Sequence, residues 1–183
     1  MTEGPKPVRR IVTIDDAGGK SFAIEDGPVC DVRTDPARPG FVSTRVWVTD
    51  ATPVRIKHAR EALARPHRID PPSRGSICRI VTFPPDAAFR NKVGGPEVAA
   101  FFRAMGSPVA STYSLKAPHP YMQKTRTLDF CVILDGEITL VLDTEEVHLA
   151  AGDTVVQRGT NHAWSNRSDR PCTIAMSSHD AAD

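Results

Sequence analysis

The residues whose types could do chemistry gather between His119 and Asn166. Asp129 begins an apolar run, and His162 follows a Gly159-Thr160 turn. A carboxylate that points into an apolar interior is costly unless it is paired, and an imidazole exchanges its proton near neutral pH. We therefore predict Asp129 and His162 as catalytic residues, with His162 as general base or metal ligand and Asp129 as second ligand or proton shuttle. The structural alternative is that each makes only a local hydrogen bond or ion pair.

Five further side chains flank this pair and are candidates to contact a substrate: Arg126, Gln157, Arg158, Tyr121 and Trp164. An arginine at the mouth of a barrel would suit an anionic substrate, because its guanidinium can bind a carboxylate through two parallel hydrogen bonds. Gln157 could point into the same mouth, Tyr121 could line it, and Trp164 could form a wall. Simpler roles are a solvated surface position for Arg158, an ion pair with the nearby carboxylate for either arginine, and a core position for Trp164.

Short apolar runs separated by turn residues must position these side chains. They predict strands at Arg10–Ile14, Phe41–Thr49, Ile77–Phe83, Leu128–Leu134, Ile138–Asp143, Glu146–Leu149, Thr154–Gln157 and Cys172–Met176. Short strands at close spacing, with little helix between them, are typical of an antiparallel sandwich or barrel. Asp135-Gly136 predicts a hairpin, because glycine tolerates the positive φ of such a turn. Ala151–Asp153 predicts a second turn.

The remaining segments complete one expected domain. Pro96–Met105 predicts a helix, with proline at its first position and a glycine just past its end. Its apolar face should cover an open side of the sheet. Arg60–Gly75 predicts a surface connection, and Ser177–Asp183 a loose tail. We expect an N-terminal extension over residues 1–75, which packs on the barrel or exchanges with a partner chain, a barrel over 76–177, and a tail over 178–183.

The composition is that of an ordinary globular domain, with 183 residues, 40% hydrophobic and 25% charged. A formal net charge of +1 offers no basic surplus for nucleic-acid phosphates. No apolar stretch reaches the length of a membrane helix or forms a signal-peptide core. We therefore expect a cytoplasmic protein with no nucleic-acid or membrane partner. Four scattered cysteines form no C-x-x-C pair and are expected to be reduced.

One block near the end of the chain resembles the cupin superfamily of small barrel proteins. Gly152-Asp153 opens a strand, Gly159-Thr160 makes a tight turn, and His162 and Asn166 follow. Gln157–Gly159 stands where cupins usually have a Pro-x-Gly sequence. This block is the stronger of the two that carry the resemblance.

An earlier block resembles the first cupin motif around Asp129 and Gly136-Glu137, with aspartate where cupins usually place glutamate. The resemblance covers roughly the last third of the chain. It implies an all-β fold, a double-stranded β-helix (jelly-roll) cupin barrel with an N-terminal strand extension and one or two short helices. Side chains from facing strands of such a barrel project into its interior.

The resemblance also implies a metal site, with which this sequence agrees only in part. Metal-binding cupins combine two His and one Glu of the first block with one His of the second. Here His162 matches the second-block His and Asp129 the Glu, but Gln123 and Thr125 stand at the two first-block His positions. The implied ligands are His162, Asp129 and Gln123, with His119 as a residue that could swing in. One divalent Fe, Mn, Ni or Zn ion, or none, is expected.

Two functions of different classes remain open at this point. The first is an enzyme of the lyase, decarboxylase, isomerase or dioxygenase class that acts on an organic acid or aromatic metabolite in the barrel. The alternative is a non-catalytic small-molecule-binding cupin that has lost its metal site. A purely structural or dimerisation module is disfavoured by the polar Asp129 and His162. Because an uncovered sheet edge invites pairing, we expect a homodimer in addition to a small-molecule ligand.

Overall fold

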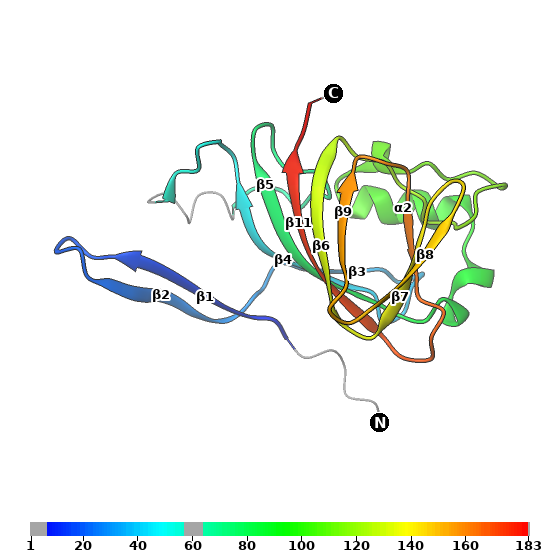
Figure 1. Ribbon diagram of the computed structural model, residues 1–183, viewed down its shortest axis with the longest axis horizontal. Coiled ribbons are helices and arrows are strands. Elements are labelled where there is room, and N and C mark those ends of the chain that lie inside the picture. The colour runs from blue at the N-terminus through cyan, green and yellow to red at the C-terminus, as the bar shows by residue number, and fades with distance from the viewer. Residues whose placement is uncertain (1–6, 57–63, 183) are drawn as a thin grey trace.

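The computed structural model describes residues 7–56 and 64–182, and its main body consists of two antiparallel sheets (Figure 1). The larger sheet has the strand order β3 (Val32–Thr34), β4 (Val42–Thr49), β5 (Ser76–Phe83), β11 (Cys172–Asp180), β6 (Thr127–Asp135) and β9 (Thr154–Arg158). The smaller sheet has the order β10 (Ala163–Ser165), β7 (Glu137–Val141) and β8 (Glu146–Ala150). The inner faces of the two sheets enclose the main hydrophobic core. The predicted antiparallel, mostly β architecture is therefore confirmed.

Alternation along the strands decides which side chains reach the interior. In β5, Ile77, Val81 and Phe83 are buried on the inner face, and Arg79 is buried in phase with them. In β6, Asp129 likewise alternates inward with apolar neighbours. Successive side chains of a strand point to opposite faces, so a polar residue in phase with apolar ones must enter the core. The register of these strands thus places two charged groups inside the barrel.

Two glycines carry the chain from one sheet to the other. Gly136 has a φ of 80° and lies between β6 and β7, and Gly152 has a φ of 97° between β8 and β9. β6 pairs with β11 and β9, whereas β7 pairs with β10 and β8. The hairpin expected at Gly136 is therefore wrong, although a tight turn is present. A Cβ at this position would lie 2.8 Å from the Pro171 carbonyl oxygen, so the crossing also needs the space that glycine leaves.

The N-terminal part contributes in two ways. β1 (Arg9–Asp15) and β2 (Ser21–Pro28) pair only with each other and project from the main body, whereas β3 and β4 extend the larger sheet next to β5 (Figure 1). The Arg10 guanidinium donates a hydrogen bond of 3.2 Å to the carbonyl oxygen of Val46 on β4. The sequence patterns did not predict β2, β3 or β10. Exchange of N-terminal strands with a partner chain stays a prediction.

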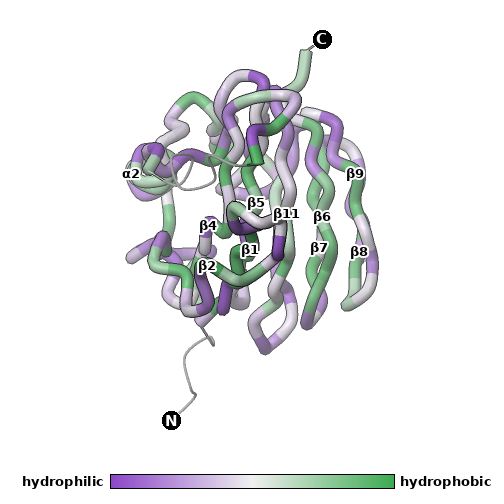
Figure 2. The backbone as a smooth tube through the Cα atoms, turned by 90° about the vertical axis from the view of Figure 1, so that its left-hand side faces the viewer, coloured by the Kyte–Doolittle hydropathy of each residue, from purple (hydrophilic) through white to green (hydrophobic). Residues whose placement is uncertain are grey.

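Helices cover one side of the barrel and leave the other side as bare sheet. α2 (Gly95–Ala104) lies beside the sheets (Figure 2). It begins one residue before, and ends one residue before, the predicted helix. Three short 3-10 helices, η2 (Asp86–Ala88), η3 (Arg90–Lys92) and η4 (Pro108–Ala110), flank it. Val98, Phe101 and Phe102 are the buried face of α2, which explains why this amphipathic segment packs against the barrel.

Two expectations about irregular segments need correction. The tail predicted to be loose from Ser177 continues β11 as far as Asp180, because its backbone pairs with β5 on one side and β6 on the other. Part of the predicted surface connection Arg60–Gly75 lies outside the described residues. In the remainder, His67 and Ile69 are buried, so that part is not a surface connection.

The outer face of β6 and β9 exposes apolar side chains. Phe130 is 47% exposed, Leu134 51% and Val156 59%. Such a face is compatible with the expected homodimer, which stays a prediction. All four cysteines are free thiols, as expected, with Cys131 and Cys172 buried. None of the helices within residues 7–56 and 64–182 has the length and apolar character needed to cross a membrane.

Candidate functional site

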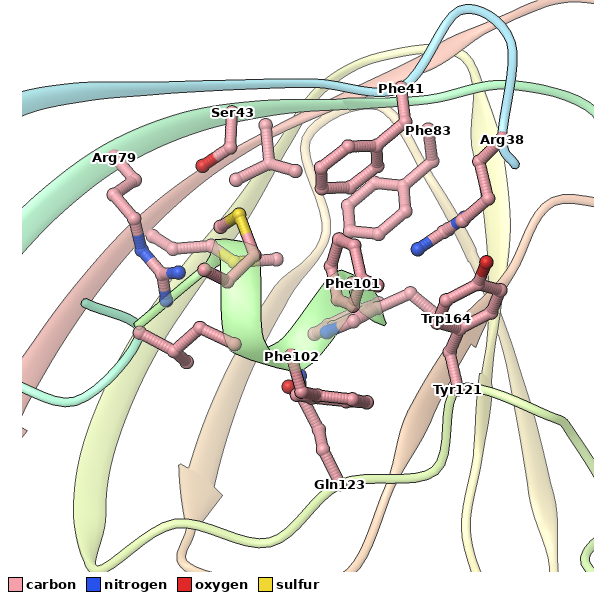
Figure 3. Close-up of a pocket in the computed structure, with 14 residues that line it drawn as sticks. Arg38, Phe41, Ser43, Arg79, Phe83, Phe101, Phe102, Tyr121, Gln123 and Trp164 are labelled. Atoms are coloured by element: carbon pink, nitrogen blue, oxygen red, sulfur yellow. The ribbon is translucent and has the colours of Figure 1, made fainter. Parts of the chain in front are cut away.

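A cavity of about 40 Å³ lies inside the barrel, beneath α2 (Figure 3). Its wall is mostly apolar and aromatic and includes Phe83 on β5, Phe101 on α2 and Trp164 on β10. Its polar lining consists of Arg38, Ser43, Arg79 and Gln123 together with the Tyr121 hydroxyl. An apolar wall with a few converging polar groups is the usual form of a small-molecule site.

We call one side of this interior the polar end and define it by Arg79, Gln123, Asp129 and His162. Arg79 is 7% exposed, and its side chain makes no hydrogen bond or direct ion pair with any residue in the described ranges. Its buried Nε atom lacks a partner there, as does Oδ1 of Asp129. Burial lowers the pKa of Arg79, and the negative charge of Asp129 partly offsets this effect. The two groups therefore attract each other without satisfying each other's hydrogen-bonding capacity.

His162 is a buried neutral imidazole whose tautomer follows from its contacts. Nδ1 lies 2.9 Å from the Thr160 carbonyl oxygen, which can only accept, so Nδ1 carries the proton. Nε2 then has a free lone pair and lies 3.3 Å from the Gln123 amide nitrogen, which donates to it. Burial lowers the pKa of His162, and the Thr160 carbonyl and the Asp129 charge partly oppose that change. This arrangement supplies a proton acceptor directly behind the Gln123 side chain.

The other predicted substrate-contacting residues divide into two groups. Tyr121 and Trp164 line the cavity. Gln157 is buried, but its amide donates to Thr160 and is occupied in holding that turn. Arg126 and Arg158 are exposed and are not part of the cavity wall. The two arginines that the sequence suggested as anion-binding residues are therefore exposed and lie outside the cavity wall.

The donor set at the position where cupins bind metal does not fit a tight transition-metal site. The described residues contain no group of three or more His, Cys, Asp or Glu side chains that could hold an ion. The groups that meet here are one imidazole, one carboxylate and the amide of Gln123. Thr125 is bonded instead to Thr127, with 2.7 Å between the hydroxyl oxygens. A tight Zn or Fe site in a protein usually has at least three imidazole, thiolate or carboxylate ligands.

His119, which the sequence suggested as a possible additional metal ligand, is held by other contacts. It is fully buried, and its Nδ1 accepts a hydrogen bond from the Tyr121 backbone N–H at 3.2 Å. Its Nε2 faces the Asp86 carboxylate at 3.3 Å. Asp86 also accepts hydrogen bonds from the Ser165 hydroxyl, at 2.6 Å, and the Asn166 backbone N–H. His119 therefore fastens the loop that carries Tyr121 and is no ligand in this structure.

We call the opposite side the aromatic end and define it by Arg38, Phe41, Phe89, Phe101 and Tyr121. The Arg38 guanidinium is 4.1 Å from the centre of the Tyr121 ring and 4.6 Å from that of Phe41. It is 3% exposed and makes no hydrogen bond or direct ion pair in the described part of the chain. Burial lowers its pKa to about 10, so it stays positively charged at neutral pH.

Sequence reasoning missed both buried arginines, but only one of them left a signal. Arg79 stands in the alternating series Ile77, Arg79, Val81, Phe83, where every second residue faces the core. An arginine in that phase predicts a buried cation. Arg38 lies in the loop between β3 and β4, where no period applies. Its burial follows from packing against side chains most of which, such as Tyr121, are distant in the sequence.

Comparison with protein families agrees with this architecture. Residues 117–178 match the family model described as "Cupin domain" (Cupin_2). Residues 117–178 are therefore similar to a cupin domain, and the antiparallel, mostly β architecture described above agrees with the jelly-roll barrel predicted from the sequence. This matched segment holds Gln123, Asp129 and His162 of the polar end. Arg38 and Arg79 lie outside it, in the part of the chain that precedes the matched segment.

Curated relatives match over a short stretch. The chain is 58% identical over 48 residues to phomopsin biosynthesis cluster protein D of Diaporthe leptostromiformis, which covers 26% of this chain and 25% of that protein. It is 46% identical over 50 residues to oryzines biosynthesis cluster protein J of Aspergillus oryzae, which covers 27% and 28%. The matches thus span about a quarter of the length of these relatives.

Solved structures with a similar fold have low sequence identity to this chain. A Cupin 2 conserved barrel domain protein from Salinispora arenicola is 16% identical, with 87% of this chain and 92% of that chain covered and a TM-score of 0.43. A putative ethanolamine utilization protein Q from Salmonella typhimurium is 9% identical, with coverages of 97% and 99% and a TM-score of 0.46.

Proposed function

We propose that the barrel binds a small organic acid whose carboxylate is held by Arg79, at a site that needs no resident metal. The observation that carries this proposal is the buried Nε of Arg79, which has no partner in the described ranges although it belongs to the cavity lining. A buried cation without a hydrogen-bonding partner is costly. A carboxylate accepts from a guanidinium through two parallel bonds and removes that cost. Ser43, whose buried Oγ also lacks a partner among the described residues, could donate to the same ligand.

The cavity limits the size of that ligand. A volume of about 40 Å³ holds on the order of three water molecules. A larger acid must displace side chains of the wall, and Phe101, Phe102 and Met105 line the cavity from the α2 side. The rest of the wall comes mainly from strands whose backbones are fixed by ladder hydrogen bonds. Ligand entry is therefore expected from the α2 side.

His162 supports a catalytic role in addition to binding. Burial lowers the pKa of His162 and so keeps the ring neutral, which leaves the Nε2 lone pair unprotonated and able to act as a weak base. The Gln123 amide contacts this atom at 3.3 Å, and Gln123 also lines the cavity. A base beside a bound carboxylate suits removal of a proton from the adjacent carbon. The relatives named for phomopsin and oryzines biosynthesis clusters are consistent with action on a small metabolite.

The binding proposal is tested by calorimetric titration of small carboxylic acids against the full chain, with and without chelator. Arg79→Met is expected to lose binding, whereas Arg158→Met, an exposed arginine, is the matched control and should bind as the unaltered chain does. Binding should survive chelation. Equal affinity of Arg79→Met and the unaltered chain, or binding that depends on added metal, would overturn the proposal.

The catalytic part is tested separately on any acid that binds. Proton NMR in D₂O follows exchange of the hydrogens next to the carboxylate. A general base predicts deuterium incorporation that His162→Gln abolishes while affinity changes little. Binding without exchange or turnover in the unaltered chain would favour the alternative function, a small-molecule-binding cupin without catalysis.

A further inference from the structure

The cavity is lined by two buried arginines, and they lie on opposite sides of it (Figure 3). Arg79 enters from β5 at the polar end, and Arg38 enters from the loop between β3 and β4 at the aromatic end. The rest of the cavity wall is mostly apolar and includes Val81, Phe83 and Trp164. The proposed carboxylate at Arg79 leaves the second cation unexplained.

The surroundings of Arg38 satisfy its charge only in part. Five aromatic rings surround it, with ring centres between 4.1 and 5.7 Å from its guanidinium carbon. Such rings attract a cation through their faces, but they offer no lone pair to the five N–H donors of a guanidinium. Its buried Nε atom has no partner among residues 7–56 and 64–182.

The nearby carboxylates are engaged with other groups. Asp35 accepts a hydrogen bond of 3.1 Å from the Tyr121 hydroxyl. Asp86 accepts from Ser165 and from the Asn166 backbone and faces His119. Both carboxylates attract Arg38 electrostatically, yet neither forms a direct ion pair with it in the described structure. Arg38 thus keeps its charge and unused donors at the edge of a cavity.

We propose that the ligand carries two acidic groups, one bound by Arg79 and the other by Arg38, so that Arg38 selects diacids over monoacids. The proposal rests on the binding function proposed above and specifies its ligand class. An apolar carbon chain between two carboxylates matches a cavity with a cation on each side and an apolar wall between them. The competing explanation is that Arg38 only anchors its loop through the aromatic rings.

The experiment compares dicarboxylates with monocarboxylates of equal chain length. Malonate, succinate, glutarate and adipate are titrated calorimetrically against propionate, butyrate, pentanoate and hexanoate. At least one diacid should bind about 10-fold or more tightly than its monoacid, as expected for one added charge-assisted contact. The chain length with the largest ratio reports the span between the two arginines.

Variants separate a role in selection from a structural role. Arg38→Met should remove the preference for the diacid while monoacids still bind, and Arg38→Lys should restore part of it. Arg33→Met, which alters an exposed arginine on β3, is the control and should leave the ratio unchanged. Circular dichroism and thermal melts establish that each variant is folded.

Two results would overturn the inference, and they differ from failure of the binding function. If monoacids bind the unaltered chain as tightly as diacids, Arg38 does not select the ligand, although Arg79 still binds a carboxylate. The same conclusion follows if a folded Arg38→Met keeps the diacid preference. If neither series binds, the proposed function fails, and the inference fails with it. Even if no Arg38 variant folds, the comparison of diacid and monoacid affinities in the unaltered chain still tests the inference.

Discussion

The polar end and the aromatic end of the barrel interior bury their charges in different ways. At the polar end, Arg79 on β5 and Asp129 on β6 lie on either side of β11, and each has a buried atom without a partner in the described part of the chain. At the aromatic end, Arg38 is surrounded by rings, and the loop that supplies Tyr121 is fastened through His119 and Asp86. The hydrogen-bonded backbone of a strand holds a charged side chain in the interior even when that side chain lacks hydrogen-bond partners. A charge on a loop needs its own network of contacts.

This comparison predicts that the Asp86 network has the largest effect on stability. Asp86→Ala would leave the Ser165 hydroxyl and the Asn166 backbone N–H without their acceptor and would remove the carboxylate that faces the His119 ring. We expect a loss of about 3 kcal/mol in the free energy of unfolding, measured by urea denaturation. Asp169→Ala, at an exposed position, is the control. A change in Asp86→Ala as small as that of the control would show that the aromatic end does not depend on this network.

At the polar end, the pair Arg79 and Asp129 should be coupled. Arg79→Met removes the charge that offsets buried Asp129 and should cost about 2 kcal/mol. Adding Asp129→Asn removes the remaining charge, so the double variant should be more stable than Arg79→Met alone. A double-mutant cycle should give a coupling of about 1 kcal/mol. Additive effects would mean that the two charges do not interact across the interior.

The buried histidines predict that the free energy of unfolding decreases as the pH falls. Burial lowers the pKa of His67, His119 and His162 below the ordinary value of 6.5. Below pH 6.5 these histidines bind protons in the unfolded chain but not yet in the folded chain. Their contribution to the free energy of unfolding is therefore fully present above pH 6.5 and is lost as pH falls through the folded-state pKa values.

Urea denaturation between about pH 7.5 and about pH 5.5 should show a decline of up to about 1 kcal/mol for each histidine. His162→Gln should make the decline shallower, because glutamine does not titrate. An unaltered slope in that variant would place the pKa of His162 at its ordinary value and contradict its burial as a neutral ring at the polar end.

The smallest effect is expected for the two arginines that point to solvent. Arg126→Ala and Arg158→Ala should change the free energy of unfolding by less than about 0.5 kcal/mol. Neither should alter carboxylate affinity, since neither lines the cavity. A large loss of affinity in Arg158→Ala would restore the role that the sequence suggested for it and weaken the assignment of Arg79.

The sequence predicted the regular parts of the fold better than their connections. Alternation and turn residues located most strands of the barrel and its helix within one or two residues, because these depend on local patterns. A glycine such as Gly136 predicts a tight turn, but not whether the next strand joins the same sheet or crosses to the other. The polar run from Ser177 was taken as loose because its pairing partners lie far away in the sequence.

The candidate site shows the same division. His162 and Asp129 carry local motif signals, and the structure places them in one region of the interior together with Gln123. Arg158 looked suitable for anion binding because it adjoins the turn before His162, yet strand alternation turns it outward while Gln157 turns inward. Arg38 has no local signal, because its burial is created by rings that α2 and four other segments contribute.

The position of β11 bears on how the chain acquires its fold. β11 inserts between β5 and β6, and its first residue pairs with Phe83, 89 positions earlier (172 − 83). Closing so long a loop costs entropy before any contact repays it, and folds dominated by such pairings fold slowly. Until β11 docks, β5 and β6 present open backbone edges that invite association with other chains. The strand that completes the cavity is thus also the one whose delay exposes the chain to aggregation.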